Sequence, residues 1–382
     1  MLDLASNDYL GLCGDPRLTA GAVAAAREWG TGSTGSRLVT GSTGLHARLE
    51  ASLASFAGAA EALVFSSGYL ANLAVITALA GALSAGGRAA SGGGGVLIVS
   101  DARNHASLID ACRLARSGAV RLAVAPHRDV AAVERLLAVR SEDSALVVTD
   151  AVFSVDGALA PVASLYAAVR AHDALLVLDE AHALGVLGPG GAGLAAEAGV
   201  AGQPDVVRTA TLSKSLASQG GAVLAVAEII DTVVDTGRGF IFDTGLAPPS
   251  AGAALAALDV LRSEPGPGPG PGPGPGLGRG SLALANARRL AELASGLGFT
   301  VVPPSAAVIA VILGDPRRAV LARETCAAAG VRAGCFRPPS VPAGQACLRL
   351  TARATMTERD FVVAERALTR VRDHVGVATT PE

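Results

Sequence analysis

Lysine is almost absent from this chain of 382 residues: it occurs once, at Lys214, against 30 arginines. A general preference for arginine explains the scarcity, and such a preference spares lysine only where arginine cannot serve. An arginine side chain stays protonated in proteins and cannot act as an amine nucleophile, whereas lysine can. The single lysine is therefore a candidate for Schiff-base chemistry.

Charge and cysteine are also sparse. Only 17% of the residues are charged and the net charge is -2, so nothing in the composition attracts nucleic acid or an anionic membrane. The five cysteines are scattered without C-x-x-C spacing, which argues against a disulfide framework and a zinc site and fits a reducing compartment. We expect a cytoplasmic protein that needs no metal and binds no nucleic acid.

Long apolar runs are missing as well. The longest uncharged stretch, between Glu61 and Arg88, is interrupted by serines, Asn72, Thr77 and several glycines. A membrane-spanning helix needs about 20 mostly apolar residues. The chain also opens without the basic and apolar regions of an export signal. We therefore expect neither a membrane span nor export.

Short apolar runs alternate with helical patterns through the middle of the chain. The runs lack polar alternation, which is typical of buried strands in a parallel sheet. This order predicts an α/β layered domain that binds ligands at the carboxyl ends of its strands. The clearest helix is expected over 42–57, where leucines recur on one face and Gly58 follows. The predicted strands are Ala62–Phe65, Val96–Ser100, Ala145–Thr149, Leu175–Asp179, Val206–Thr211 and Ala222–Val226.

A second, smaller α+β domain is predicted from residue 248 onwards. Six consecutive Pro-Gly pairs at 265–276 interrupt it, and we interpret them as a solvated loop without function. The predicted division is an N-terminal segment 1–40, a large domain 41–247 and a small domain 248–382. Within the small domain we expect helices over 251–262, 282–297 and 318–329 and strands over 308–313 and 347–351.

The residues best suited to catalysis or ligand binding lie at two strand ends. Asp179 ends a strand in the stretch L-D-E-A-H, and a buried carboxylate needs a cation or strong donors. Helix capping is the structural alternative for this aspartate. The letters D-E-A-H also suggest a helicase, but no phosphate-binding loop with a lysine precedes them. Lys214 follows another strand in T-L-S-K, where Thr211 and Ser213 can donate to a phosphate.

Further polar motifs follow other strands. The stretch S-S-G-Y at 66–69 opens a helix, and a helix start binds anions. His105, in N-H-A-S, could stack on a flat ring, with a surface loop as the alternative, and Ser154 lies in F-S-V-D-G. The glycine-rich stretch 30–44 lacks the preceding strand of a dinucleotide site, so we reject that interpretation. Pyridoxal phosphate (PLP) needs the combined set, because its aldehyde binds a lysine, its pyridine nitrogen a carboxylate, and its phosphate N–H groups and hydroxyls.

The motifs together resemble those of the α-oxoamine synthases, a family of fold-type I PLP enzymes, from Leu4 to about Arg370. The matching stretches include S-N-D-Y-L-G-L at 6–12, G-S-T-G-S-R-L-V-T-G at 32–41, L-D-E-A-H at 178–182 and T-L-S-K at 211–214. The stretch R-P-P-S-V-P-A-G at 337–344 resembles the branch of the family that condenses alanine with a pimeloyl thioester. The resemblance implies a fold-type I PLP-transferase architecture: a large α/β/α cofactor-binding domain with a mostly parallel sheet, and a smaller α+β C-terminal domain.

The resemblance also implies a role for each matching residue. Lys214 would hold the cofactor and move the proton of the substrate's α carbon, and Asp179 would keep the pyridine nitrogen protonated. His105 would stack on the ring, and Arg349, helped by Asn7, would bind the amino acid carboxylate. Catalytic roles are thus expected for Lys214, His105, Asp179 and His182; cofactor contacts for Gly68, Tyr69, His105, Ser154, Asp179, His182, Thr211 and Lys214; substrate contacts for Asn7, His105, Ser340 and Arg349.

The implied activity is the decarboxylative condensation of L-alanine with a pimeloyl thioester in biotin biosynthesis. The acyl group would arrive on coenzyme A or on an acyl carrier protein, and the enzyme would be a homodimer. The alternatives are a glycine-using relative, such as 2-amino-3-ketobutyrate CoA ligase, and a non-catalytic scaffold subunit, which would be expected to have lost the lysine. Relatives carry an arginine for the acyl substrate ahead of S-N-D-Y-L-G-L, and nothing here matches it, so a raised Michaelis constant for the thioester is expected.

Overall fold

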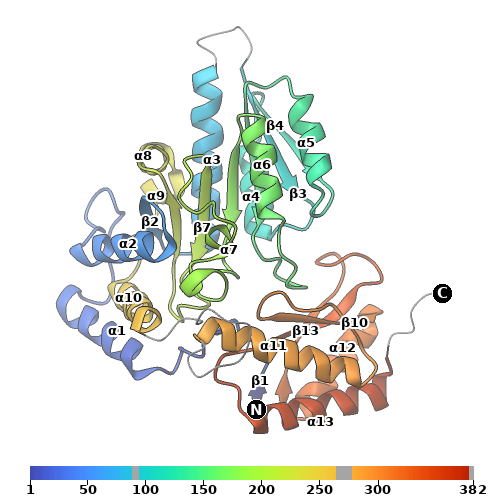
Figure 1. Cartoon of the computed structure of the whole chain (residues 1–382). Helices are drawn as coiled ribbons and strands as arrows, with labels where there is room; N and C mark the ends of the chain where they lie inside the picture. The colour runs from blue at the N-terminus through green and yellow to red at the C-terminus, as the bar shows by residue number, and fades with distance from the viewer. Residues whose placement is uncertain (88–93, 264–277, 378–382) are drawn as a thin grey trace. The chain divides into compact units, whose positions relative to one another are not determined.

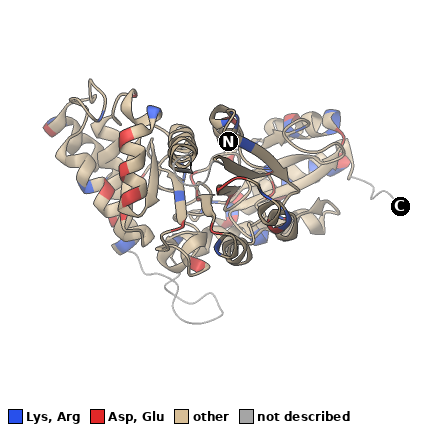
Figure 2. Cartoon of the chain, turned by 90° about the horizontal axis from the view of Figure 1, so that it is seen from above, with Lys and Arg blue, Asp and Glu red and all other residues tan. Residues whose placement is uncertain are grey.

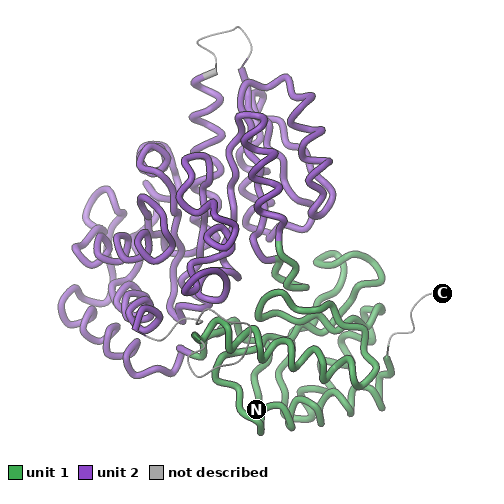
Figure 3. Tube along the Cα trace, in the orientation of Figure 1, with its two compact units in different colours: residues 1–11, 153–159, 265–382 green, residues 12–152, 160–264 purple. Residues whose placement is uncertain are grey.

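The computed structural model describes residues 1–87, 94–263 and 278–377. The chain divides into two compact units (Figure 3). The larger unit contains residues 12–152 and 160–264, and the smaller contains residues 1–11, 153–159 and 265–382. The Pro-Gly run at 265–276 lies outside the described residues.

The larger unit is built on a seven-stranded sheet of order β2-β8-β7-β6-β5-β3-β4 (Figure 1). Helices lie on both faces, since α3, α4, α8 and α9 share a core with one face and α5 and α6 contact β3, β4 and β6. This arrangement is the expected α/β/α layering. The strands are β2 (Glu61–Phe65), β3 (Val96–Asp101), β4 (Val120–Ala125), β5 (Ser144–Asp150), β6 (Leu175–Asp179), β7 (Val206–Thr211) and β8 (Gly221–Ala225). The helices are α1 (Pro16–Trp29), α2 (Gly44–Ala57), α3 (Gly68–Gly87), α4 (Ala106–Ala115), α5 (Val130–Ala138), α6 (Val162–Ala171), the 3-10 turn η1 (Pro189–Gly191), α7 (Leu194–Glu197), α8 (Ala227–Thr236), α9 (Arg238–Ile241) and α10 (Pro248–Ser263).

The six predicted strands are confirmed to within one residue at each end. Their continuous apolar runs are buried on both faces, as the missing polar alternation indicated. The parallel arrangement was wrong for one strand, because β8 pairs antiparallel with both β2 and β7. A fully buried strand shows the same apolar run whichever way it points, so the sequence pattern could not reveal this reversal.

The edge strand β4 was not predicted. Its burial is incomplete, with Arg121 and Val124 exposed, because it has a neighbour on only one side. An edge strand of this kind lacks the continuous buried run by which the other strands were recognised. It pairs in parallel with β3 and extends the sheet by one strand.

Helix α3 is long and apolar enough, by length and composition alone, to cross a membrane. In the structure it lies against the sheet, and Ala71, Val75 and Leu79 are buried in the shared core. Its apolar composition is therefore accounted for by packing within the larger unit. The helix begins at Gly68, directly after β2, and this places its first turn beside the strand ends.

The smaller unit holds a four-stranded antiparallel sheet of order β12-β13-β10-β9 and a separate two-stranded parallel pair of β1 with β11. Its core contains apolar side chains of α11, α12, α13 and the strands. The expected α+β class of this region is confirmed. The elements are β1 (Leu2–Asp3), α11 (Arg279–Gly296), β9 (Thr300–Val301), β10 (Val308–Gly314), α12 (Pro316–Ala328), β11 (Val331–Arg332), β12 (Gly334–Phe336), β13 (Ala346–Thr351) and α13 (Glu358–Val375).

The observed division differs from the predicted boundaries at 40 and 248. Helix α10 was assigned to the small domain but belongs to the larger unit, where it packs on α1 and α2. Residues 1–11 belong to the smaller unit, because β1 pairs with β11. Residues 153–159 join it too, and Gly157 lies so close to β10 that an added Cβ would be 2.7 Å from the carbonyl oxygen of Val308.

Charged residues are thinly spread over the ribbons. Figure 2 shows lysine and arginine interspersed with aspartate and glutamate, with most of the chain uncharged, as expected from 17% charged residues. No strongly basic stretch accompanies this pattern in the sequence, so it gives no support to nucleic-acid binding.

Candidate active site

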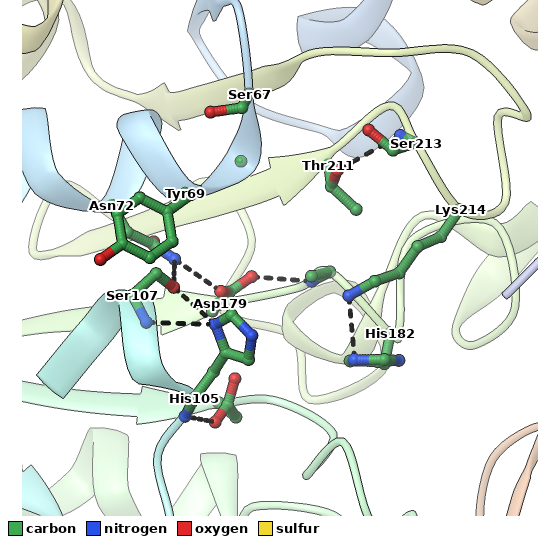
Figure 4. Close-up of a pocket in the computed structure, with 13 residues that line it drawn as sticks. Ser67, Tyr69, Asn72, His105, Ser107, Asp179, His182, Thr211, Ser213 and Lys214 are labelled. Carbon is green, nitrogen blue, oxygen red and sulfur yellow. Dashed lines mark hydrogen bonds between the residues drawn. The ribbon is translucent and has the colours of Figure 1, made fainter. Parts of the chain in front are cut away.

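The carboxyl ends of three neighbouring strands open into one cavity of the larger unit (Figure 4). Strands β5, β6 and β7 end at Asp150, Asp179 and Thr211, and Asp150 and Asp179 are direct partners in the sheet register. The cavity measures about 240 Å³. Its lining is Ser67, Gly68, Tyr69, Asn72, His105, Ser107, Asp150, Asp179, Ala181, His182, Thr211, Ser213 and Lys214.

Lys214 extends into this cavity from the loop that follows β7. Its Nζ lies 2.9 Å from Nε2 of His182, which comes from the loop after β6. The only lysine of the chain thus has an imidazole as its immediate partner. The pair can pass a proton between amine and ring, which is a requirement for an amine that alternates between nucleophile and base.

Asp179 is buried and hydrogen-bonded at both carboxylate oxygens. Oδ1 accepts from the backbone N–H of Ala181 at 2.9 Å, and Oδ2 accepts from Nδ2 of Asn72 at 2.7 Å. The first bond closes a local turn of the backbone after β6, and the second holds the other carboxylate oxygen in the cavity. Residues 181–186 form turns rather than a helix, so Asp179 does not cap a helix, and its expected contact with the cofactor stays a prediction.

His105 lies at the start of α4, where its ring and backbone are both held. Its backbone N–H donates to Oδ2 of Asp150 at 2.6 Å, and its ring Nδ1 lies 2.7 Å from Oγ of Ser107. Partial burial lowers the pKa of His105, and the positive charge of Lys214 lowers it further, against the opposing effect of Asp179. The ring is thus favoured in its neutral form, which suits stacking on a cationic aromatic ligand.

A candidate anion site lies where α3 begins. The backbone of Gly221 approaches so closely that an added Cβ would lie 2.4 Å from the carbonyl oxygen of Ser67 and 2.5 Å from the amide nitrogen of Gly68. A Cβ on Gly68 would in turn lie 3.0 Å from Cβ of Thr211. The N–H groups of a helix's first turn have no partners within the helix and bind phosphate well. The two glycines therefore bring a helix start and two hydroxyl residues, Thr211 and Ser213, to one place.

Tyr69 lies beside this helix start. Its side chain is 44% exposed, and its hydroxyl donates to Asp110 at 2.6 Å. The hydrogen bond to Asp110 raises the pKa of Tyr69, so the phenol stays neutral. The tyrosine lines the cavity as an aromatic wall rather than as a charged group.

Asp150 is a second buried carboxyl group in the cavity. Burial and the nearby negative charge of Asp179 raise its pKa well above the usual range, although the N–H of His105 opposes this. Sequence analysis assigned no role to Asp150. The same signal that identified Asp179, an acidic residue at the end of a buried strand, was present here.

A buried carboxylate supports the loop that carries His182. Glu180 is fully buried, and its carboxylate accepts from the N–H groups of Leu194 and Ala195 at 2.8 Å each. The charge of Arg208, also fully buried, opposes the rise in the pKa of Glu180 that burial causes. The two hydrogen bonds fix Glu180, which lies between Asp179 and His182, to the start of α7.

A separate cluster in the smaller unit surrounds Arg349. Its Nε donates to the carbonyl oxygen of Ser154 at 2.5 Å, and its Nη2 donates to Oδ1 of Asn7 at 3.0 Å and to the hydroxyl of Tyr9 at 3.3 Å. Burial raises the pKa of Tyr9, so this hydroxyl keeps its proton. Three expected site residues are thus brought together around a guanidinium, the group best suited to bind a carboxylate.

Ser340 and Ser154, which were expected to contact the substrate and the cofactor, are not among the residues that line the cavity. Ser340 lies in the exposed turn between β12 and β13, where its N–H donates to the carbonyl oxygen of Arg337 at 2.9 Å. Ser154 belongs to the smaller unit and contacts Arg349 through its backbone rather than its hydroxyl. The proposed side-chain contacts of both serines remain predictions.

Three further cavity residues, Asn72, Ser107 and Asp150, escaped the sequence analysis. Asn72 lies four residues after Gly68 on α3, and residues at this spacing share one face of a helix. The spacing would therefore have indicated that Asn72 faces the same cavity. Ser107 lay within the N-H-A-S stretch but received no role of its own.

The residues of the cavity fit PLP. The cofactor needs an amine, a carboxylate, imidazole or hydroxyl donors and a phosphate site, and Lys214, Asp179, His182 and the start of α3 provide them within one cavity. The fit depends on the close approach of backbones that glycine allows at position 221.

Comparisons with known proteins agree with this chemistry. The family model for aminotransferases of class I and II matches residues 1–368. A protein of Mycolicibacterium vanbaalenii named 8-amino-7-oxononanoate synthase is 55% identical over 97% of this chain and 89% of its own length. A protein of Mycobacterium marinum with the same name is 54% identical over 97% of this chain and 87% of its own length.

Solved structures give the same result for the fold. Serine palmitoyltransferase of Sphingomonas wittichii matches with a TM-score of 0.86 at 29% identity, over 99% of this chain and 88% of that one. A high-resolution structure of serine palmitoyltransferase that contains PLP matches with a TM-score of 0.86 at 28% identity, over 98% and 88%. The 8-amino-7-oxononanoate synthase of Francisella tularensis shares the fold, with a TM-score of 0.77 at 23% identity over 98% of both chains. The chain therefore belongs to the class I and II aminotransferase family and, within it, to the PLP-dependent 8-amino-7-oxononanoate synthases.

Proposed function

We propose that this enzyme condenses L-alanine with a pimeloyl thioester to give 8-amino-7-oxononanoate, carbon dioxide and a free thiol, a step of biotin biosynthesis. The observation that carries the proposal is the position of the chain's only lysine, in one cavity with Asp179 and 2.9 Å from His182. The identity of 53–55% to proteins of this name, over 97% of the chain, supports the choice of substrates.

Bound PLP supplies an aldehyde that captures amines and a pyridinium ring that withdraws electrons from the α carbon of an amino acid. We propose that Lys214 would hold the cofactor through Nζ and, with alanine bound, would take the proton from the α carbon of the amino acid. His182, at 2.9 Å, would accept or return a proton at Nζ as the lysine changes role. The carboxylate of Asp179 would hold the proton on the pyridine nitrogen by opposite-charge pairing.

The other cofactor contacts follow from their positions. His105 would stack on the ring in its neutral form, as its lowered pKa favours. His182 and Ser154 would donate to the phenolate oxygen. Gly68, Tyr69 and Thr211 would bind the phosphate and the ring edge at the start of α3, where helix N–H groups attract an anion.

The substrate contacts are proposed for the smaller unit. Arg349 would bind the carboxylate of alanine, since a guanidinium binds carboxylates through two parallel bonds. Asn7 accepts from Arg349 and would orient it, and Ser340 would contact the substrate from its turn. The reaction joins the α carbon of alanine to the acyl carbonyl carbon, breaks the carbon–sulfur bond, and releases the alanine carboxylate as carbon dioxide.

The cellular setting is proposed by analogy with the family. We expect a homodimer in the cytoplasm, with the pimeloyl group on coenzyme A or an acyl carrier protein. Cys112, Cys326, Cys335 and Cys347 are free thiols, which suits a reducing compartment.

Product analysis tests the proposed function. The enzyme is incubated with PLP, pimeloyl-CoA and either L-alanine or glycine, and products are identified by mass spectrometry. One methyl group is worth about 1–3 kcal/mol in a pocket, so we expect alanine to be preferred by about 10–200-fold. A preference for glycine, or condensation only with a short acyl thioester, would overturn the proposed substrates.

A further inference from the structure

The buried side chain of Asn72 links the two halves of the cavity, and the roles proposed above leave it unassigned. It projects from the second turn of α3 and is 2% exposed (Figure 4). Its Nδ2 donates to Oδ2 of Asp179 at 2.7 Å and to Oγ of Ser107 at 2.9 Å. A single amide group therefore contacts the predicted pyridine-nitrogen partner and a neighbour of the predicted stacking histidine.

The orientation of this amide is fixed by its partners. Its Oδ1 accepts from the hydroxyl of Thr209 at 2.6 Å, and Thr209 is itself buried on β7. If the amide were turned over, its oxygen would face Asp179, and a carboxylate without a proton can only accept. Asn72 thus points both of its N–H groups into the cavity, where one favours the ionised form of Asp179.

The second N–H group determines what Ser107 can do. Because Oγ of Ser107 accepts from Asn72, its own proton is directed to the remaining close partner, Nδ1 of His105, at 2.7 Å. The backbone N–H of Ser107 also donates to this Nδ1, at 3.2 Å. A nitrogen that accepts from two donors carries no proton, so the neutral ring of His105 holds its proton on Nε2.

We propose that Asn72 is a positioning residue that keeps Asp179 ionised and, through Ser107, keeps His105 neutral with its ring proton on Nε2. The inference deepens the proposed function, since it takes Asp179 and His105 as the groups that contact PLP. It adds one element to that function: the same amide contributes to the charge of the carboxylate and, together with the backbone N–H of Ser107, to the tautomer of the imidazole. The lowered pKa of His105 agrees with a neutral ring.

The first test compares Asn72→Leu with Thr77→Val. Thr77 lies on the same helix, and its hydroxyl donates only to helix carbonyl oxygens, those of Leu73 and Ala74, so it is a matched control. In the cofactor-free protein, the ring nitrogens of His105 are titrated by NMR and identified with His105→Gln. Without Asn72, the proton of Ser107 is no longer directed to Nδ1, and the neutral ring loses a hydrogen bond, so we expect the pKa of His105 to rise. An unchanged titration in Asn72→Leu, with Thr77→Val as reference, would overturn the proposal.

The same variants are measured for PLP affinity by equilibrium dialysis. Loss of a hydrogen bond to a charged group predicts about 10- to 100-fold weaker binding for Asn72→Leu and no change for Thr77→Val. Equal affinities in the two variants would contradict the role of Asn72 at Asp179.

Two variants of Thr209 test the proposal if Asn72→Leu does not fold. Thr209→Ser keeps the hydroxyl that orients the amide, and Thr209→Val removes it at nearly constant volume. We expect wild-type behaviour from the serine variant and a raised His105 pKa from the valine variant. Identical titrations would overturn the proposal. A protein that binds no PLP but shows these His105 shifts would instead refute the proposed function and leave the role of Asn72 standing.

Discussion

At the scale of single residues, the cavity holds two neighbouring buried carboxyl groups. Asp179 and Asp150 lie side by side in the sheet register, yet only Asp179 receives a strong side-chain donor, Asn72. Burial and the nearby charge of Asp179 raise the pKa of Asp150 well above the usual range. The environment of Asp150 therefore favours its protonated form.

Replacing Asp179 by asparagine tests the charge pairing. The neutral amide cannot favour a protonated pyridine nitrogen, so PLP binding should weaken by about 10- to 100-fold, the equivalent of one hydrogen bond to a charged group. Turnover should fall further, because the ring loses its electron-withdrawing charge. Cofactor affinity by dialysis and turnover by product analysis measure the two effects. Wild-type affinity and turnover in Asp179→Asn would place the electron-withdrawing role elsewhere.

Replacing Asp150 by asparagine tests the raised pKa. An acid with a raised pKa binds more protons in the folded state than in the unfolded state, so it lowers stability as pH rises from its usual value of 3.8 to its folded value. Asparagine removes this loss while its oxygen can still accept from the N–H of His105. The variant should therefore gain stability over the wild type as pH increases from about 4 to 8, as followed by urea unfolding. A relative stability that falls or stays constant over this range would contradict the assignment.

At the scale of elements, the site depends on how closely β8 approaches the start of α3. Gly221 and Gly68 permit this approach, and the hydroxyl of Thr211 is held against the carbonyl oxygen of Gly220 at 3.1 Å. The strands themselves could be predicted because they are continuous apolar runs. The close approach could not, since it depends on two segments about 150 residues apart that no local pattern connects.

Adding a methyl group at Gly221 tests the approach. Gly221→Ala would force the new Cβ against the backbone of Ser67 and Gly68, and overpacking of this kind costs about 1–3 kcal/mol. We expect reduced stability and weaker binding of both PLP and inorganic phosphate. Gly81→Ala, at an exposed site of α3 with nothing within 4 Å, is the matched control and should stabilise the protein by about 0.5–1 kcal/mol. Loss of binding in the control, or none in Gly221→Ala, would show that the approach does not form the anion site.

The elements that the sequence analysis missed show which features local sequence patterns do not predict. Helix α13 begins with a capping box, in which Thr357 and Asp360 bond each other's backbone N–H groups, so its start could have been predicted from the sequence. The direction of β8 could not, because both neighbours bury it equally. Edge strand β4 falls between these cases, since its exposed residues, Arg121 and Val124, break the run of apolar burial.

At the scale of the whole molecule, the expected site residues divide between the two compact units. His105, Asp179, His182 and Lys214 were predicted from strand ends and meet in one cavity of the larger unit. Arg349 was predicted only through the family resemblance, and the structure places it with Asn7 in the smaller unit. Strand order along the chain predicts the first group. The second depends on pairing between segments over 300 residues apart, which the chain's local pattern does not contain.

The most direct measurement is the chemical identity of the group that binds PLP. The enzyme is mixed with PLP, reduced with borohydride, digested and mapped by mass spectrometry, with Lys214→Ala treated in parallel. Lys214 is the only side-chain amine, so one modified peptide, containing residue 214, is expected, and the variant should remain folded but unmodified and inactive. Cofactor bound covalently in Lys214→Ala, or modification confined to the N-terminal amine in the wild type, would contradict the assignment of this cavity as the active site.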